Sequence, residues 1–117
     1  MRDFRELRIW KDGIDRVVDV YELTKQFPKE EEYGLKSQIK RAAVSVPSNI
    51  AEGCSRVSQR EFRHFLEISL GSSFEVETDI VVAQRLAFIS HLEETRLTHS
   101  FHSLQRGINA LISNIKV

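Results

Sequence analysis

Apolar residues recur every three or four positions along most of this chain, and that spacing constrains its fold more than any other feature. The pattern covers residues 6–26, 31–52 and 58–88, and a last segment that begins after Leu92. This period is typical of amphipathic α-helices, and no segment alternates convincingly as a half-buried strand would. Pro28 and Gly53 end the first two segments, and the spacing of Ser58 and Glu61 predicts a capping box at the start of the third.

Short loops join the four segments, which favours antiparallel packing between sequence neighbours. The 117 residues suffice for one domain with its own core, and only two prolines and five glycines interrupt them. The sequence therefore predicts an all-α fold, an antiparallel up-down-up-down four-helix bundle, as a single domain over residues 1–117. In the first segment, the stripe expected to pack inward consists of Leu7, Trp10, Ile14, Val17, Val18 and Tyr21.

The third segment carries more apolar surface than one bundle core needs. A first stripe, which includes Phe62, Leu66 and Val76, is expected to face the core. A second stripe beside it consists of Leu70, Phe74, Val81 and Phe88. An exposed stripe of this kind marks an interaction surface, so these four residues are predicted to lie at a subunit interface of a homo-oligomer. The alternative is that neighbouring helices wrap further around this one.

A polar row follows one flank of the second segment, beside its apolar stripe. Its members are Gln38, Arg41, Ser45, Ser48 and Glu52, and Asn49 lies between this row and the apolar stripe. A polar row that borders a core is expected to make hydrogen bonds across a helix–helix contact or a subunit seam. On the third segment, Glu77 faces the apolar arc, whereas Glu75 and Asp79 are expected to point outward. Because an unpaired buried charge is costly, Glu77 is expected to form a structural ion pair with Arg41.

Pro47 lies inside the second segment, where a proline removes a backbone donor and costs about 3 kcal/mol. One interpretation is a continuous, bent helix whose freed carbonyls bond to Ser or Asn side chains or to water. The other interpretation ends one helix near Ser45 and begins another with Pro47 in its first turn.

Charge is balanced over the whole chain, with 17 basic and 17 acidic residues, but it is segregated along it. Residues 34–63 hold six basic and two acidic residues, whereas residues 64–94 hold one basic and six acidic residues. A neutral chain with segregated charge can still present a basic face. The residues predicted to contact nucleic-acid phosphates are Lys36, Lys40, Arg56, Arg60 and Arg63. The alternative is that these charges only form ion pairs with neighbouring carboxylates.

Motifs that carry catalysis or metal binding are weak in this sequence. Glu61-x-x-His64 resembles half of a paired-metal motif of helix bundles, but no second copy exists. We therefore expect no catalytic residues, no metal, no cofactor and no enzymatic activity. Cys54, expected in a turn, is the single cysteine of the sequence, so it cannot form an intrachain disulfide. The charged N-terminus resembles neither a signal peptide nor a membrane span. Both features favour a cytoplasmic location.

Residues 27–53, FPKEEEYGLKSQIKRAAVSVPSNIAEG, are followed by a Ser-x-x-Glu-Phe helix start and by LEISLGSSFEVETDI. These motifs resemble a bacterial four-helix bundle family that includes proteins encoded within intervening sequences of 23S ribosomal RNA genes. The resemblance extends from Phe4 and Trp10 to Leu86. It implies a four-helix protomer and a closed pentamer. One branch of this family consists of the accessory proteins of diversity-generating retroelements, which bind nucleic acid and a polymerase. The resemblance to that branch implies the same two kinds of partner for this chain.

Two functions follow as hypotheses. The first is a non-enzymatic oligomer that binds RNA or DNA through basic residues repeated in each copy. Such binding would depend little on base sequence and would weaken strongly as the salt concentration rises. The second is a protein-binding scaffold or accessory subunit that contacts no nucleic acid. Neither hypothesis involves a membrane.

Overall fold

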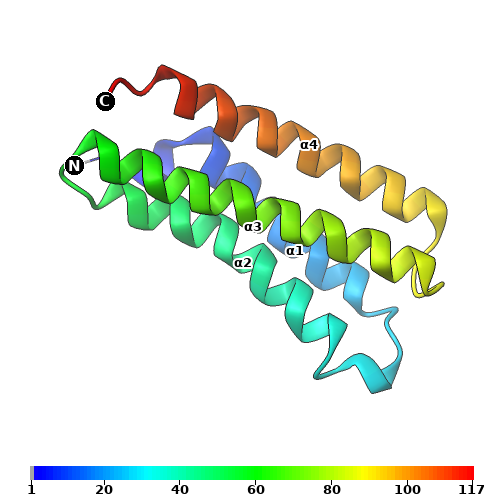
Figure 1. Ribbon diagram of the computed structural model, residues 1–117. Helices are drawn as coiled ribbons and strands as arrows, with labels where there is room; N and C mark the ends of the chain where they lie inside the picture. The colour runs from blue at the N-terminus through cyan, green and yellow to red at the C-terminus, as the bar shows by residue number, and fades with distance from the viewer. Residues whose placement is uncertain (1) are drawn as a thin grey trace.

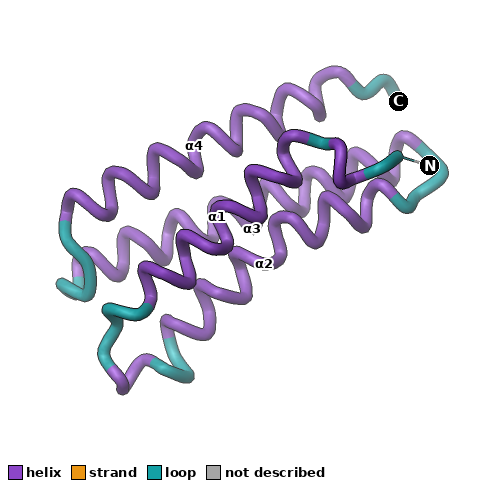
Figure 2. The backbone as a smooth tube through the Cα atoms, turned by 180° about the vertical axis from the view of Figure 1, so that it is seen from behind, coloured by secondary structure: helices purple, strands orange, loops and turns teal. Residues whose placement is uncertain are grey.

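Four α-helices follow one another around the bundle in the order of the sequence. The computed structural model describes residues 2–117 and places α1 at Arg8–Thr24, α2 at Leu35–Cys54, α3 at Gln59–Arg85 and α4 at His91–Asn114. Single 3-10 turns, η1 (Phe4–Glu6) and η2 (Lys29–Glu31), precede α1 and α2. Each helix packs against the next, and α4 packs back against α1 (Figure 1). The predicted antiparallel four-helix bundle is confirmed, and residues 2–117 contain no strand (Figure 2).

The core lies along the bundle axis and draws one stripe from each helix. Its fully buried members include Val20 of α1, Ile39 of α2, Ile80 of α3 and Phe101 of α4. Burial of each such side chain stabilises the fold by about 1.5–3 kcal/mol. Both chain ends lie at the same end of the bundle as the turn between α2 and α3, as Figure 2 shows from behind. No helix within residues 2–117 is both long and apolar enough to cross a membrane.

The stripe predicted to be buried on α1 is partly wrong. Ile14, Val18 and Tyr21 are exposed, and Ile9, Val20 and Leu23 are buried instead. Apolar residues occupy two faces of α1, and periodicity does not tell which face packs inward.

Two glycines help to determine which face of α1 packs inward. A Cβ added to Gly13 would lie 3.3 Å from the Cβ of Pro47 on α2, and one added to Gly107 of α4 would lie 3.0 Å from a methyl carbon of Ile9. These close approaches direct the Ile9 and Gly13 face of α1 into the bundle.

Helix α2 runs without a break through Pro47, so the interpretation with two separate helices is wrong. Pro47 is buried against Gly13. Around it, the carbonyl of Ser45 accepts a hydrogen bond from the Asn49 side chain at 2.8 Å. The carbonyl of Val46 accepts one from the Ser69 hydroxyl of α3, also at 2.8 Å. Pro47 removes the backbone donor to the Ala43 carbonyl, and these two side-chain bonds go to the carbonyls one and two residues before the proline.

The ends of α3 differ from the predicted ones in two ways. Ser58 accepts a hydrogen bond from the Glu61 amide at 3.0 Å, but the Glu61 carboxylate meets the Ser58 hydroxyl rather than its amide, so the capping box is half formed. The complete box lies at Ser90 and Glu93, at the start of α4. Helix α3 ends at Arg85, before residue 88, because the chain turns there. Ala87 adopts a left-handed φ of 62° in this turn.

Candidate functional site

The five basic residues predicted to contact nucleic acid do not form one surface. Lys36 and Lys40 lie in the first turns of α2, and Arg56, Arg60 and Arg63 follow its end. A helix of 20 residues is about 30 Å long, so the two groups lie at opposite ends of α2. The arginine group lies at the end of the bundle that also holds both chain ends (Figure 1).

The arginine group surrounds the turn between α2 and α3. Arg56 forms an ion pair with Glu52 at 2.6 Å, and its guanidinium lies 4.8 Å from the centroid of the Phe65 ring. Arg63 lies 3.8 Å from Glu67, a longer and weaker contact. Arg60 is exposed, and no ion pair found among residues 2–117 includes it.

Arg2 joins this group, although the sequence interpretation did not include it. Its guanidinium lies 3.9 Å from the centroid of the Phe62 ring, and it donates hydrogen bonds to the Arg56 carbonyl at 3.3 Å and to the Gln59 side chain. The contact spans more than fifty positions of the chain, so no local pattern could have indicated it. We refer to Arg2, Arg56, Arg60 and Arg63 as the arginine cluster.

The two lysines of α2 have separate surroundings. Lys36 forms an ion pair with Glu32 at 3.1 Å. Lys40 lies over the Tyr21 ring of α1, with its Nζ atom 4.5 Å from the ring centroid. Both lysines thus have neighbours within the protomer, and Lys40 lies on the α1 side of α2.

The polar row of α2 makes two contacts with α3. Gln38 donates a hydrogen bond to Asp79 at 2.8 Å, and the hydroxyls of Ser45 and Ser72 lie 2.9 Å apart. Asn49 bonds back to Ser45 at 2.9 Å. Arg41 donates a hydrogen bond to Ser37 within α2, and Glu52 accepts one from Arg56, which lies just after the end of α2. A groove of about 450 Å³ runs along this row and is lined by Tyr33, Gly34, Gln38, Arg41, Ala42, Ser45, Ser72 and Glu75.

Asp79 is buried, contrary to the expectation that it points outward, because the α3 surface around it packs against α2. Its Oδ1 atom accepts the Gln38 hydrogen bond, whereas its Oδ2 atom is buried and has no hydrogen-bond partner among the described residues. Burial raises the pKa of Asp79 above its ordinary value of 3.8, against the Gln38 hydrogen bond and with the aid of the Glu75 charge. The contacts of Asp79 within the protomer therefore do not fully offset the free-energy cost of burying its carboxylate.

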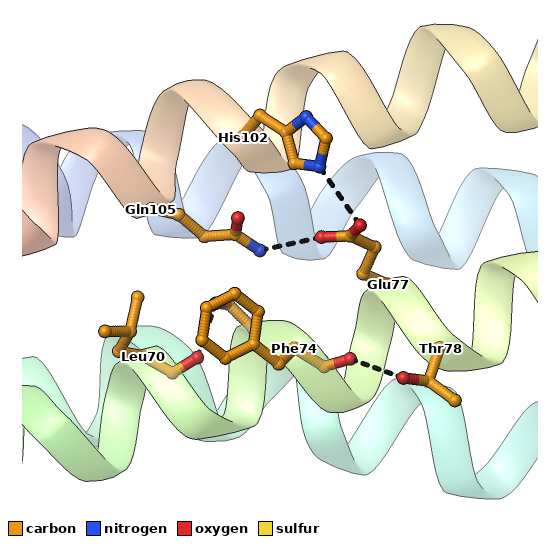
Figure 3. A network of polar contacts seen from close by, with 7 residues as sticks. Leu70, Phe74, Glu77, Thr78, His102 and Gln105 are labelled. Atoms are coloured by element: carbon orange, nitrogen blue, oxygen red, sulfur yellow. Dashed lines mark hydrogen bonds and ion pairs between the residues drawn. The ribbon is translucent and has the colours of Figure 1, made fainter.

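The expected ion pair between Glu77 and Arg41 is wrong, because Glu77 points to α4 rather than to α2. His102 Nε2 lies 3.0 Å from one carboxylate oxygen, and Gln105 Nε2 donates to the other at 3.0 Å (Figure 3). Burial raises the pKa of Glu77, but the hydrogen bonds from Gln105 and His102 outweigh it, so its pKa lies below the usual 4.5. Glu77 thus joins α3 to α4.

The four residues predicted at the subunit interface differ in exposure. Phe74 is 49% exposed and Val81 is 37% exposed. Leu70, one turn before Phe74 in Figure 3, is half-buried against the core. Phe88 does not belong to this stripe, because α3 has already ended, and its ring packs on Phe27 with 5.6 Å between centroids.

Cys54 and His64 are the remaining candidate positions for reactivity or metal binding. Cys54 is buried at the end of α2 rather than lying in an open turn, and burial raises the pKa of its thiol. His64 is exposed and stacks edge-on beside Phe65. Within residues 2–117, no three His, Cys, Asp or Glu side chains gather as metal ligands would.

Comparison with known proteins gives a consistent identity at the level of the family. Residues 5–110 match the family described as 23S rRNA-intervening sequence protein. A similar solved structure is a protein of unknown function from the S23 ribosomal protein family of Bacteroides thetaiotaomicron. It has 20% sequence identity and a TM-score of 0.83, and the match covers 91% of this chain and 99% of that one. No curated protein matches. The chain therefore belongs to the 23S rRNA-intervening sequence protein family.

Proposed function

We propose that this protein is a non-enzymatic, self-associating four-helix bundle that binds the phosphate backbone of RNA or DNA through its arginine cluster. The observation that carries the proposal is the gathering of Arg2, Arg56, Arg60 and Arg63 at one end of the bundle. Guanidinium groups bind phosphate oxygens through paired hydrogen bonds, and such contacts do not depend on base sequence. Arg60, exposed and outside any ion pair found among residues 2–117, is the most available of them.

Each protomer offers few phosphate contacts, so useful affinity requires several copies. Self-association repeats the arginine cluster, and the second contact then benefits from a high effective concentration. The family resemblance implies a closed ring of five copies. The exposed apolar residues of α3, Phe74 and Val81, support self-association, because contiguous apolar surface on a small protein marks an interaction site.

Filter binding or gel shift at low salt tests the nucleic-acid proposal. The probes are a single-stranded RNA and a duplex DNA of mixed sequence. Replacing Arg56, Arg60 and Arg63 together with Gln should abolish binding. For every phosphate that a variant no longer binds, the slope of log K against log salt should also fall by about 0.7 for a single strand and about 0.9 for duplex DNA.

A triple variant at the other end of the bundle provides the matched control. Replacing Lys25, Lys29 and Arg85 with Gln removes the same charge far from the arginine cluster, so binding should weaken much less. If the parent protein binds neither probe at low salt, or if both triple variants lose the same affinity, nucleic-acid binding by this cluster is refuted.

A protein-binding scaffold without nucleic-acid contact is the second candidate. It is favoured by the ion pairs that Arg56 and Arg63 already form with Glu52 and Glu67, which occupy part of the cluster. Light scattering coupled to size exclusion measures self-association itself. A closed pentamer gives a mass of five protomers, and a monomeric mass at micromolar concentration contradicts both candidates in their oligomeric form.

A further inference from the structure

Two apolar surfaces with opposite charges are exposed on different helices. The α1/α2 face consists of Ile14, Val18, Tyr21, Lys40 and Val44. The α3 face consists of Gly71, Phe74, Glu75, Asp79 and Val81. We propose that the α1/α2 face of one copy docks on the α3 face of a second copy, with Lys40 directed to the carboxylates of Glu75 and Asp79. This rests on the self-association proposed above and names the surfaces that make it.

The α1/α2 face combines exposed apolar side chains with one cation. Val18, at its centre, is 62% exposed, and Ile14 and Tyr21 lie one turn to either side on the same helix face. Lys40 lies over the Tyr21 ring, and none of the ion pairs of residues 2–117 includes it. Its charge is therefore held beside apolar surface without a carboxylate partner in its own protomer.

The α3 face combines an exposed aromatic ring with carboxylates. A cavity of about 290 Å³ opens on this face and is lined by Gln38, Gly71, Phe74, Glu75, Thr78 and Asp79. Asp79 is 4% exposed, and its Oδ2 atom has no partner in the described part of the chain. Gln38, whose side chain is exposed, donates a hydrogen bond to the other Asp79 oxygen.

Gly71 leaves room for a second chain on the α3 face. A Cβ added there meets no atom within 4 Å, so the helix surface is bare beside the Phe74 ring. In a helix interior, glycine costs about 1 kcal/mol relative to alanine. No packing within the protomer explains that cost at Gly71, and close approach by another chain does.

The two faces complement each other in charge and in apolar character. A cation set among apolar side chains meets the exposed Glu75 carboxylate beside an aromatic ring, and the charge of Asp79, which lines the cavity below, adds to the attraction. The two faces share no residue, so the contact is heterologous, and repeated copies either close into a ring or grow into a filament.

Mixing two differently impaired variants tests this arrangement directly. Val18→Glu brings a carboxylate against Glu75 and Asp79 and blocks the α1/α2 face. The double variant Gly71→Gln, Phe74→Gln fills the open space at Gly71 and replaces the aromatic ring with a polar side chain, without changing the charge of the α3 face. Both changes lie at exposed helix positions, so circular dichroism should show folded protein in each case. Light scattering coupled to size exclusion should give a monomer for each variant alone.

The mixture should contain a species of two protomers, because each variant retains the face that the other lacks. The parent protein should give a larger mass. Leu92→Gln removes an equally exposed apolar side chain outside both faces and should leave the parent mass unchanged. If the parent self-associates but the mixture stays monomeric, the assignment of faces is overturned while self-association stands. A monomeric parent overturns both, and neither result depends on nucleic-acid binding.

The charge contact has its own test. Lys40→Met keeps an apolar side chain of similar length and removes the cation. The association constant should fall about tenfold or more, as for loss of one partner of a desolvated charge pair, and its salt dependence should diminish. Lys29→Met, outside both faces, is the control. Unchanged association in Lys40→Met overturns the role of Lys40 in docking.

Discussion

Replacement of Asp79 with Asn is expected to stabilise the monomer at neutral pH, although it removes a charged group that accepts a hydrogen bond. Gln38 still donates to the remaining oxygen, and the unpartnered carboxylate oxygen disappears. A buried polar atom without a partner costs about 1–3 kcal/mol. The new amide nitrogen is also without a partner, so the gain comes from removing the buried charge, whose desolvation raises the pKa of Asp79, and we expect it at the low end, about 1 kcal/mol.

The pH dependence of this gain has a definite sign. Burial raises the pKa of Asp79 above 3.8, so the folded state binds its proton more tightly than the unfolded state does. The penalty of the carboxylate is therefore present at pH values above the folded pKa and disappears as the pH falls through it toward 3.8. Asparagine does not titrate, so the advantage of the variant should shrink over the same range.

The measurement is urea unfolding followed by circular dichroism, from neutral pH to about pH 4, in the Val18→Glu background, where docking is blocked. Glu75→Gln removes an exposed carboxylate one turn away and serves as the control, with a smaller expected effect. Near pH 7 the gain corresponds to a thermal midpoint roughly 4 °C higher. A variant less stable than its parent at neutral pH, or an advantage that grows in acid, would refute the reasoning.

The other predictions concern packing and the contact between α3 and α4. In the Val18→Glu background, where docking is blocked, Gly71→Ala should raise stability by about 1 kcal/mol, because helix propensity improves in open space. Gly53→Ala should instead lower it by about 1–3 kcal/mol, because the added Cβ would lie 2.9 Å from Phe65. Thermal melts of the two variants should therefore shift in opposite directions. Glu77→Ala leaves buried Gln105 without its acceptor and should cost about 1–3 kcal/mol in urea unfolding, unlike Glu67→Ala on the exposed surface. The lowered pKa of Glu77 means that its contribution is present at neutral pH and is lost as the pH falls through the folded pKa, below 4.5.

Local sequence determined the helices and most of their boundaries. The 3.6-residue period, Pro28 and the Ser58 cap depend on neighbours within a few positions, so a single sequence is enough to place them. Gly53, expected to end the second helix, lies inside α2, which continues to Cys54. The same holds for the core stripe of α3, where Phe62, Leu66 and Val76 are buried as predicted. The exposure of Phe74 follows from the same helical phase.

Tertiary packing decided what local pattern left open. Helix α1 has two apolar faces, and Gly13 against Pro47 determines which of them turns inward. The partners of Glu77 depend on the rotation of α3 relative to α4, a relation between distant segments that no spacing encodes. Arg2 reaches Arg56 because the N-terminus and the turn after α2 lie at the same end of the bundle. Local spacing determines secondary structure through short-range sterics and hydrogen bonds, whereas the partner of each charged side chain depends on contacts between helices that exist in the folded bundle.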